Sequence, residues 1–188
     1  MTSFNGFLRF RDVSLRRGGR LLFEGFNLEL GPGEALHVIG PNGSGKSSLI
    51  RLAAGLLRPE RGEVERSDVA LADENLALDR ELGLRAALGQ WVDEYPLDRA
   101  LEIMGIDDLA KVPVRLLSTG QARKARLVRV VASGASLWLL DEPLNGLDAE
   151  GSERLALVID SMRRSGCTVV VASHSPPPGE WRLLEIGG

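Results

Sequence analysis

The chain has 188 residues, of which 44% are hydrophobic and 26% charged, and its formal net charge is −3. This length and composition fit one globular domain with a full core and exclude a disordered or fibrous chain. The weak negative charge argues against nucleic acid as the main partner, because phosphate backbones are bound by clustered positive charge.

Cysteine content and hydropathy indicate in which cellular compartment the protein is expected. Cys167 is the single cysteine, which excludes an internal disulfide and a cysteine zinc site, and it opens an apolar run that predicts a small core residue. No apolar run approaches the roughly 18 residues of a membrane span, and the N-terminus lacks the plan of a signal peptide. We therefore expect a cytoplasmic protein, for which docking on a membrane protein stays open.

The chain opens with two runs of alternating apolar residues, 8–15 and 21–30. Between them the sequence Arg17-Gly18-Gly19-Arg20 predicts a β-hairpin, because two glycines suit the tight turn that joins antiparallel strands. Gly31-Pro32-Gly33 predicts a second turn, and residues 35–39 then predict a short buried strand.

Residues 40–47 fit the phosphate-binding pattern of Gly, any four residues, Gly, Lys, and Ser or Thr. The pattern lies between the expected strand and a run at helical spacing, residues 49–56, so backbone N–H groups and the positive helix end should face a polyphosphate. We expect Lys46 to reach the β- and γ-phosphates and Ser47 to bind Mg²⁺. The predicted nucleotide-binding residues here are Gly40, Pro41, Asn42, Gly43, Ser44, Gly45, Lys46, Ser47 and Ser48.

The middle of the chain changes from strands to helices. The helix after the loop is expected to end near Leu57, and residues 64–72 offer one or two short strands. Apolar residues spaced by three and four then predict two amphipathic helices, 84–95 and 97–104, on either side of a proline. Two aromatic residues of this segment are expected to anchor its core: Trp91 and Tyr95.

Helices and strands alternate in the rest of the chain. The expected elements are a helix from an N-cap at Ser118 to about Ala132, a strand at 137–140, a helix at 152–164, a strand at 167–172 and an edge strand at 181–186. This order predicts an α/β domain around a parallel sheet. We expect a nucleotide-binding core of residues 1–74 and 134–188, with residues 75–133 inserted as a helical subdomain.

Chemical groups follow three of the expected strands: the phosphate loop, then Asp141 with Glu142, then His174. Ligands of open parallel sheets bind at the carboxyl ends of the strands, so these groups should meet. We expect Asp141 to complete the Mg²⁺ shell, Glu142 to act as general base on the attacking water, and His174 to hydrogen-bond the γ-phosphate. Alone, the acidic pair could be a turn and the histidine a structural residue, so this interpretation depends on the loop.

The run Leu117-Ser118-Thr119-Gly120-Gln121 resembles the signature of ATP-binding-cassette (ABC) ATPases. Residues 138–143 resemble the second nucleotide motif of that family, residues 144–148 are similar to the loop that follows it, and His174 matches its switch histidine. The resemblance covers nearly the whole chain. It implies a P-loop NTPase fold with a RecA-like parallel core, an N-terminal antiparallel β subdomain and an inserted α-helical signature subdomain.

The same resemblance implies that ATP is hydrolysed between two copies of the chain. Ser118, Gly120 and Gln121 of one copy would close over the γ-phosphate held by the other, in a head-to-tail homodimer around two ATP·Mg²⁺. A serine-capped helix end that carries a glycine is a suitable anion site, although an ordinary helix cap has the same residues.

Two positions depart from the family. Glu74, with Asp73 beside it, stands where relatives usually have a glutamine near the metal; a carboxylate can still bind Mg²⁺, but it adds negative charge beside ATP. Relatives also stack adenine on an aromatic residue near positions 14–18, where this chain has Ser14, Leu15, Arg16 and Arg17. An arginine plane could replace the ring, and the sequence does not say which arginine.

Within the family, residues 22–25, 50–56, 114–121 and 135–140 resemble the small ATP-binding subunit of the haem exporter of cytochrome c maturation. This implies a role in haem export or delivery, membrane subunits of the transporter as partners, and a peripheral place on the cytoplasmic face of the bacterial inner membrane. The alternatives are a cassette ATPase of another small-substrate transporter, a soluble cassette ATPase acting on nucleic acid or ribosomes, and an inactive ATP switch. The intact set of Lys46, Asp141, Glu142 and His174 argues against the last.

Overall fold

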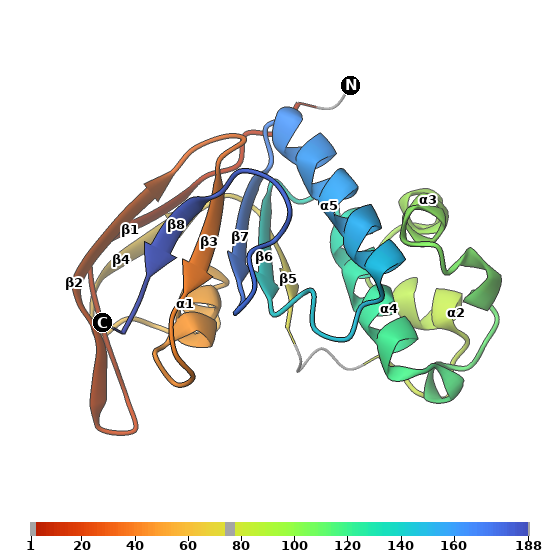
Figure 1. Ribbon diagram of the computed structural model, residues 1–188, viewed down its shortest axis with the longest axis horizontal. Helices are drawn as coiled ribbons and strands as arrows, with labels where there is room; N and C mark the ends of the chain where they lie inside the picture. The colour runs from red at the N-terminus through yellow and green to blue at the C-terminus, as the bar shows by residue number, and fades with distance from the viewer. Residues whose placement is uncertain (1–2, 74–77, 188) are drawn as a thin grey trace.

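Two β-sheets organise the chain, which the computed structural model describes over residues 3–73 and 78–187 (Figure 1). Within these residues, a three-stranded antiparallel sheet has the order β2-β1-β4, and a five-stranded parallel sheet has the order β5-β6-β7-β3-β8. The strands are β1 (Leu8–Arg17), β2 (Arg20–Leu30), β3 (Ala35–Ile39), β4 (Arg61–Arg66), β5 (Val69–Ala72), β6 (Leu137–Asp141), β7 (Thr168–Ala172) and β8 (Arg182–Glu185).

The antiparallel sheet confirms the predicted hairpin. Arg17 pairs with Arg20 across a two-residue turn. The turn residues Gly18 and Gly19 have φ of 56° and 78°, a left-handed conformation that glycine adopts without a Cβ clash. The stretch 64–72 contributes to two strands, and they lie in different sheets: β4 pairs with β1, and β5 pairs with β6.

The parallel sheet confirms the predicted α/β class. Strands β6, β7 and β3 lie side by side in its middle and are almost wholly buried, which explains their continuous apolar sequences. Strand β8 pairs only with β3 within the described sheet, as expected of an edge strand. The carboxyl ends of the three central strands therefore meet at one edge.

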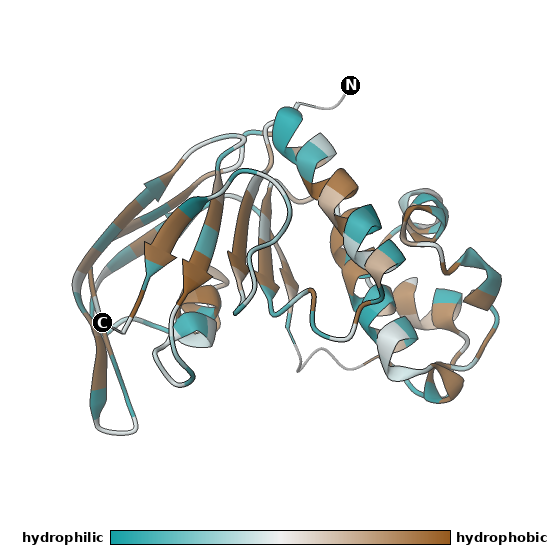
Figure 2. Cartoon of the chain, viewed as in Figure 1, coloured by the Kyte–Doolittle hydropathy of each residue, from teal (hydrophilic) through white to brown (hydrophobic). Residues whose placement is uncertain are grey.

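Each face of the parallel sheet has its own core. Along β6, Leu137 and Leu139 pack with the antiparallel sheet and helix α1 (Lys46–Ala53), whereas Trp138 and Leu140 pack with the helices of the other face. Because successive strand residues point to opposite faces, α1 and these helices are separated by the sheet. Figure 2 shows the hydrophobic residues of the strands between the two layers. The helices of the second face are α2 (Leu84–Leu88), α3 (Glu94–Met104), α4 (Thr119–Ala132) and α5 (Ala149–Arg164).

Helix α1 ends at Ala53, four residues before the expected end at Leu57. Gly55 adopts φ of 75°, and the N–H groups of Leu56 and Leu57 turn back to the carbonyl of Arg51. This is the usual way in which a glycine terminates a helix. The prediction was wrong because the apolar spacing continues through Leu56, whose side chain is in fact 61% exposed.

The two helices predicted around the proline have other bounds. The first ends at Leu88, and the second begins at Glu94, so Pro96 lies in the first turn of α3, where a missing N–H group costs no helical hydrogen bond. The prediction that Trp91 anchors the core is wrong, because its side chain is 57% exposed and lies beneath the Arg129 guanidinium at 4.4 Å. The side chain of Tyr95, the second predicted anchor, is not among the side chains that the structure describes.

The starts of helices α4 and α5 are set by their N-capping residues. Helix α4 has the predicted bounds and the predicted Ser118 N-cap. Helix α5 begins at Ala149, three residues earlier than expected, because the Asp148 carboxylate accepts a hydrogen bond from the Gly151 N–H group and caps it. Two short 3₁₀ helices lie between α3 and α4: η1 (Asp107–Leu109) and η2 (Val114–Leu116).

Two simpler expectations can be compared directly. Cys167 is buried, as predicted, and burial raises the pKa of its thiol to about 12. It is therefore a core residue and not a reactive thiol. Across residues 3–73 and 78–187, no helix is both long and apolar enough to cross a membrane.

Candidate active site

The loop between β3 and α1 has the backbone that a phosphate cradle requires. Gly40, Gly43 and Gly45 have φ of 151°, 76° and 112°, which other residues adopt only with strain. A Cβ on residue 40 would lie 2.3 Å from the carbonyl oxygen of Ile186, so this position also excludes a side chain by contact. The Lys46 ammonium lies inside the loop and donates to the carbonyls of Gly40 and Pro41 at 2.7 and 3.2 Å.

Serine hydroxyls surround the same loop. Ser44 Oγ is buried, and no group among the described residues hydrogen-bonds to it. Ser48 Oγ accepts a hydrogen bond from Arg17 Nη1 at 3.4 Å, whereas Arg16 lies 3.9 Å from Glu60. Of the two arginines considered for the nucleotide, Arg17 is thus the one that reaches the loop. A buried hydroxyl without a partner and a confined ammonium fit an anion such as a polyphosphate.

Ser47 and Asp141 provide two hard oxygen groups side by side. Burial raises the pKa of the Asp141 carboxyl above its ordinary value; a hydrogen bond with Ser47 opposes the rise, and the neighbouring charge of Glu142 adds to it. A hydroxyl and a carboxylate together are ligands that suit Mg²⁺. Glu74, the third predicted metal ligand, lies outside the described residues, while Asp73 is buried with its carboxylate 3.9 Å from Arg51 Nη2.

Glu142 has an unusual backbone that its neighbours hold in place. Its φ is 49°, in the left-handed region, and its N–H group donates to the carbonyl of Ala172 at 2.8 Å. The side chain is oriented as well, because Oε2 accepts a hydrogen bond from Asn145 Nδ2 at 3.2 Å. Residue 142 is therefore turned out of the strand direction and fixed at the edge of the sheet.

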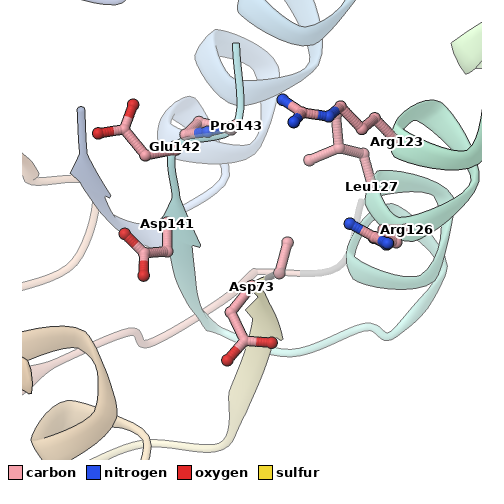
Figure 3. Close-up of a pocket in the computed structure, with 8 residues that line it drawn as sticks. Asp73, Arg123, Arg126, Leu127, Asp141, Glu142 and Pro143 are labelled. Carbon is pink, nitrogen blue, oxygen red and sulfur yellow. The ribbon is translucent and has the colours of Figure 1, made fainter. Parts of the chain in front are cut away.

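His174 links the acidic pair to the phosphate loop. Its Nε2 atom lies 2.8 Å from Asn42 Oδ1 and 3.6 Å from Glu142 Oε1. With the contact between Ser47 and Asp141, the structure thus brings together the three groups that follow β3, β6 and β7. A narrow pocket of about 30 Å³ next to them is lined by Asp141 and Glu142 on one side and by arginines of α4 on the other (Figure 3).

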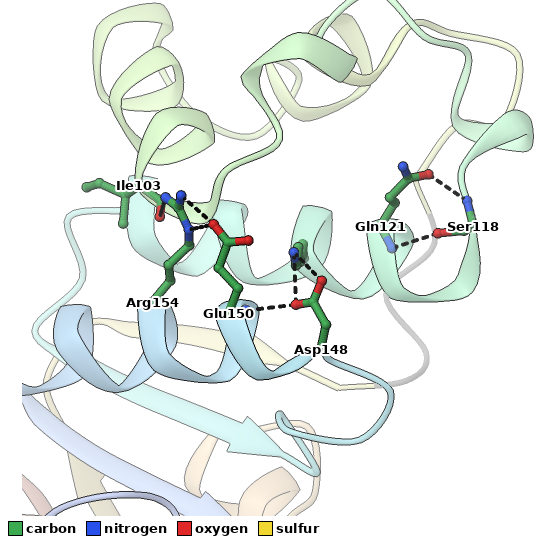
Figure 4. Close-up of polar contacts among 8 residues, drawn as sticks. Ile103, Ser118, Gln121, Asp148, Glu150 and Arg154 are labelled. Carbon is green, nitrogen blue, oxygen red and sulfur yellow. Dashed lines mark hydrogen bonds and ion pairs between the residues drawn. The ribbon is translucent and has the colours of Figure 1, made fainter.

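The start of α4 forms a closed pair of hydrogen bonds (Figure 4). Ser118 Oγ accepts from the Gln121 N–H group at 3.2 Å, and the Ser118 N–H group donates to Gln121 Oε1 at 2.9 Å. Among the described residues, no hydrogen bond uses the Ser118 hydroxyl proton or the Gln121 amide NH₂ group. Gly120 lies between them, where a Cβ would come within 3.1 Å of the Gly146 carbonyl.

The predicted signature residues do not join the rest of the site. In the part of the chain that the structure describes, no hydrogen bond links Ser118, Gly120 or Gln121 to residues 40–48. Helix α4 belongs to the core on one face of the parallel sheet and α1 to the core on the other. Instead, α4 is tied to the segment after Glu142, through Lys124 with Asp148 and Arg123 with the Asn145 carbonyl.

Some polar contacts of the site were missed at the sequence level. Asn145 orients Glu142, and its place three residues later in the loop could have indicated this. The approach of Arg51 to Asp73 joins α1 to the end of β5. His37 contacts Ser173 across the sheet, and no sequence pattern pairs residues so far apart.

Comparison with known proteins gives consistent matches. The family model described as "ABC transporter" matches residues 23–145. The "Cytochrome c biogenesis ATP-binding export protein CcmA" of Sphingopyxis alaskensis is 55% identical over 86% of this chain and 87% of that protein. The protein of the same name from Novosphingobium aromaticivorans is 54% identical over 88% of this chain and 87% of that protein.

Solved structures give the same fold at lower identity. A putative ABC transporter ATP-binding protein from Pyrococcus furiosus has a TM-score of 0.82 and 20% identity, over 96% of this chain and 97% of that one. A structure described as the ATP binding subunit of an ABC transporter has a TM-score of 0.81 and 23% identity, over 89% and 79% of the two chains. At these identities the likeness shows the fold alone.

Substituting Asp141→Asn should raise the free energy of unfolding at pH 7, measured by chemical denaturation without nucleotide or Mg²⁺. The pKa of Asp141 in the folded protein lies above its ordinary value of 3.8. At a pH above the folded-state pKa, the charged carboxylate therefore lowers the free energy of unfolding, and at a pH below 3.8 it has no such effect. The gain should therefore shrink as the pH falls toward 4.

Asp148→Asn is a control for which we expect the opposite change in the free energy of unfolding at pH 7. Hydrogen bonds from the Gly151 N–H group and Lys124 lower the pKa of Asp148, so its contribution to stability is present at pH 7 and is lost at low pH. This variant should be less stable than the wild type at pH 7. An Asp141→Asn variant that is also less stable at pH 7 would contradict the assigned cost of burial.

Proposed function

The chain belongs to the ABC transporter family and is an ATPase of that family, and from this premise we propose that two copies close around two ATP·Mg²⁺ to drive an export complex of cytochrome c biogenesis. The observation that carries the proposal is the division of the site by the parallel sheet. Helix α1, which begins at the phosphate loop, and helix α4 pack on opposite faces of the sheet, and this supports a site to which two copies each contribute one part.

The phosphate loop and the end of β6 are proposed to hold ATP and its metal. Loop N–H groups and Ser44 would bind phosphate oxygens, and Lys46 would exchange its two carbonyl partners for the β- and γ-phosphates. Ser47 and Asp141 would hold Mg²⁺, which supplies charge neutralisation when bound. Glu74 stays in this proposal as a further metal ligand.

Glu142 is proposed as the group that accepts a proton from the attacking water. Its hydrogen bond with Asn145 and its left-handed backbone fix the carboxylate at the carboxyl end of β6, beside the loop. His174 contacts Glu142 on one side and Asn42 of the phosphate loop on the other. It can therefore keep the proposed base at a fixed position relative to the part of the loop that would bind the γ-phosphate. Lys46, Glu142 and His174 are thus the proposed catalytic residues.

A second copy is proposed to complete the site. The reciprocal hydrogen bonds of Ser118 and Gln121 leave two side-chain donors pointing out of the helix end, where the helix dipole also favours an anion. Within residues 3–73 and 78–187, these donors make no hydrogen bond to the phosphate loop of their own chain, so we propose that they serve the γ-phosphate held by a neighbouring chain. The two sites of a symmetric pair would form together.

Membrane subunits are the proposed partners, and an apolar groove on this chain is the proposed place of contact. The groove has a volume of about 470 Å³ and is lined by residues of β5, α4 and the segment around Trp91. Leu56 and Trp91 are 61% and 57% exposed, and the Arg129 guanidinium lies over the indole ring. Docking of this groove would keep the chain on the cytoplasmic face of the inner membrane.

Haem is the cargo we propose, on the likeness to the cytochrome c biogenesis export proteins. The nucleotide site does not need to touch the cargo, because coupling to transport passes through the membrane subunits. A second candidate is a cassette ATPase that serves another small-substrate transporter, since the loop, the acidic pair and the histidine would be the same in both. The partner subunit distinguishes them.

Glu142→Gln should reduce ATP turnover by about 100-fold or more, because general-base catalysis contributes roughly that much. ATP binding should survive, so the variant should accumulate as an ATP-loaded dimer, detected by size-exclusion chromatography with Mg²⁺. Glu150→Gln, the same change at an exposed residue of α5 paired with Arg154, should behave as the wild type. Wild-type turnover in the Glu142 variant, or a monomer under all conditions, would contradict the assigned base.

Leu56→Glu should prevent the recovery of membrane subunits when the full chain is captured from native membranes. Leu157→Glu is the matched control, because Leu157 is similarly exposed, at 64%, but lies on α5 away from the groove. ATP binding should be unchanged in both variants. Equal recovery with both would exclude the groove, and recovery of a permease unrelated to cytochrome c biogenesis would overturn the proposed cargo.

A further inference from the structure

His37 is a polar residue in the middle of a strand whose other residues are apolar and nearly all buried. It lies in β3, and its side chain is 1% exposed. Its neighbours Leu36 and Val38 point into the core shared with α1, so the imidazole points to the opposite face of the sheet. A histidine at such a position needs polar partners, because burying unpaired polar atoms costs stability.

The partners of His37 come from a single residue at the end of β7. Its Nε2 atom lies 3.1 Å from the Ser173 carbonyl oxygen and 3.0 Å from Ser173 Oγ. A carbonyl only accepts hydrogen bonds, so Nε2 carries the proton. The same assignment suits the hydroxyl, because Ser173 Oγ donates its own proton to the Ser175 carbonyl at 2.7 Å and can accept from the imidazole.

The other ring nitrogen shows that packing alone does not explain this residue. Nδ1 is buried and has no hydrogen-bond partner among the residues that the structure describes. A leucine or another apolar side chain would avoid that cost. The hydrogen bond of Nε2 offsets the cost of the unpaired Nδ1, and both contacts of Nε2 are with Ser173.

Ser173 directly precedes His174. Its backbone N–H group donates to the Val38 carbonyl at 3.3 Å, so residue 173 is attached to β3 through both its backbone and the His37 imidazole. From there the chain turns outward, and His174 contacts Asn42 and Glu142. Asn42 itself follows β3 by three residues. Strand β3 therefore supports both partners of the contact between His174 and the loop: His174 through Ser173, and Asn42 through the backbone that leaves the strand.

We propose that His37 is a positioning residue that fixes the turn at residues 173–175 and so holds His174 against Asn42 and Glu142. The inference rests on the proposed role of His174 in ATP hydrolysis. His37 touches neither substrate nor metal; it acts through Ser173. Without the Nε2–H donor, the backbone hydrogen bond from Ser173 to Val38 is the one that remains between residues 173–175 and β3 in the described structure, and His174 is free to leave the two groups that it joins.

The test compares His37→Gln with His37→Asn in the full chain. The side-chain nitrogen of glutamine can take the place of Nε2, whereas that of asparagine reaches only the place of Nδ1. We expect the Gln variant to keep the wild-type kcat and the Asn variant to lose about tenfold or more, with KM for ATP unchanged, because displacement of a reacting group by about 1 Å is costly. His37→Leu should share the low kcat without a lower melting temperature.

A spectroscopic measurement tests the positioning separately from activity. The chain has two histidines, so in each His37 variant the NMR signals of the remaining imidazole belong to His174. The hydrogen bond to Asn42 should persist in the Gln variant and weaken in the Asn and Leu variants. Wild-type kcat in the Asn or Leu variant, or a parallel loss of kcat and melting temperature in all three, would overturn the inference.

His174→Ala, measured alongside, separates this inference from the proposed function. If that variant hydrolyses ATP at the wild-type rate, the role given to His174 in hydrolysis is wrong, and the NMR comparison still decides whether His37 positions it. If His174→Ala is inactive while His37→Asn is fully active with an unchanged His174 signal, the proposed function stands and the role of His37 is excluded.

Discussion

The parallel ladder of β6, β7 and β3 is the constraint on which the rest of the structure depends. Its hydrogen bonds place the carboxyl ends of three strands at one edge, and each strand ends in a different chemical group. The contacts from Ser47 to Asp141 and from His174 to Asn42 and Glu142 follow from that register. A shift of one residue in any pair would exchange the side chains that face the two cores and would separate these groups.

The same sheet also divides the protein. Alternate residues of each central strand face two separate cores, one with α1 and one with α4, and among the described residues no hydrogen bond joins the phosphate loop to the capped start of α4. The donors of Ser118 and Gln121 lie at an exposed helix end, where we propose that they bind the nucleotide of a second copy. In this account the need for a second copy is a consequence of topology, and ATP would act as the link between copies.

The sequence predicted those features that depend on local chemistry. Two glycines indicated the hairpin, the loop pattern indicated its flanking strand and helix, and Ser118 indicated the start of α4. The errors came where contacts distant in sequence decide. Trp91 has helical spacing, yet α2 ends before it and Arg129 covers the ring on the surface. The pairing of His37 with Ser173 joins residues 136 positions apart, for which no spacing rule exists.

Mixing two inactive variants tests the central claim most directly. Lys46→Ala removes the cation of the phosphate loop, and Ser118→Arg blocks the start of α4, so each variant alone should fail to hydrolyse ATP. In a mixed pair, the intact loop of one copy would face the intact helix end of the other, and one complete site would form. The account predicts that the mixture recovers part of the wild-type turnover. A mixture as inactive as its components, or full activity of Ser118→Arg alone, would contradict it.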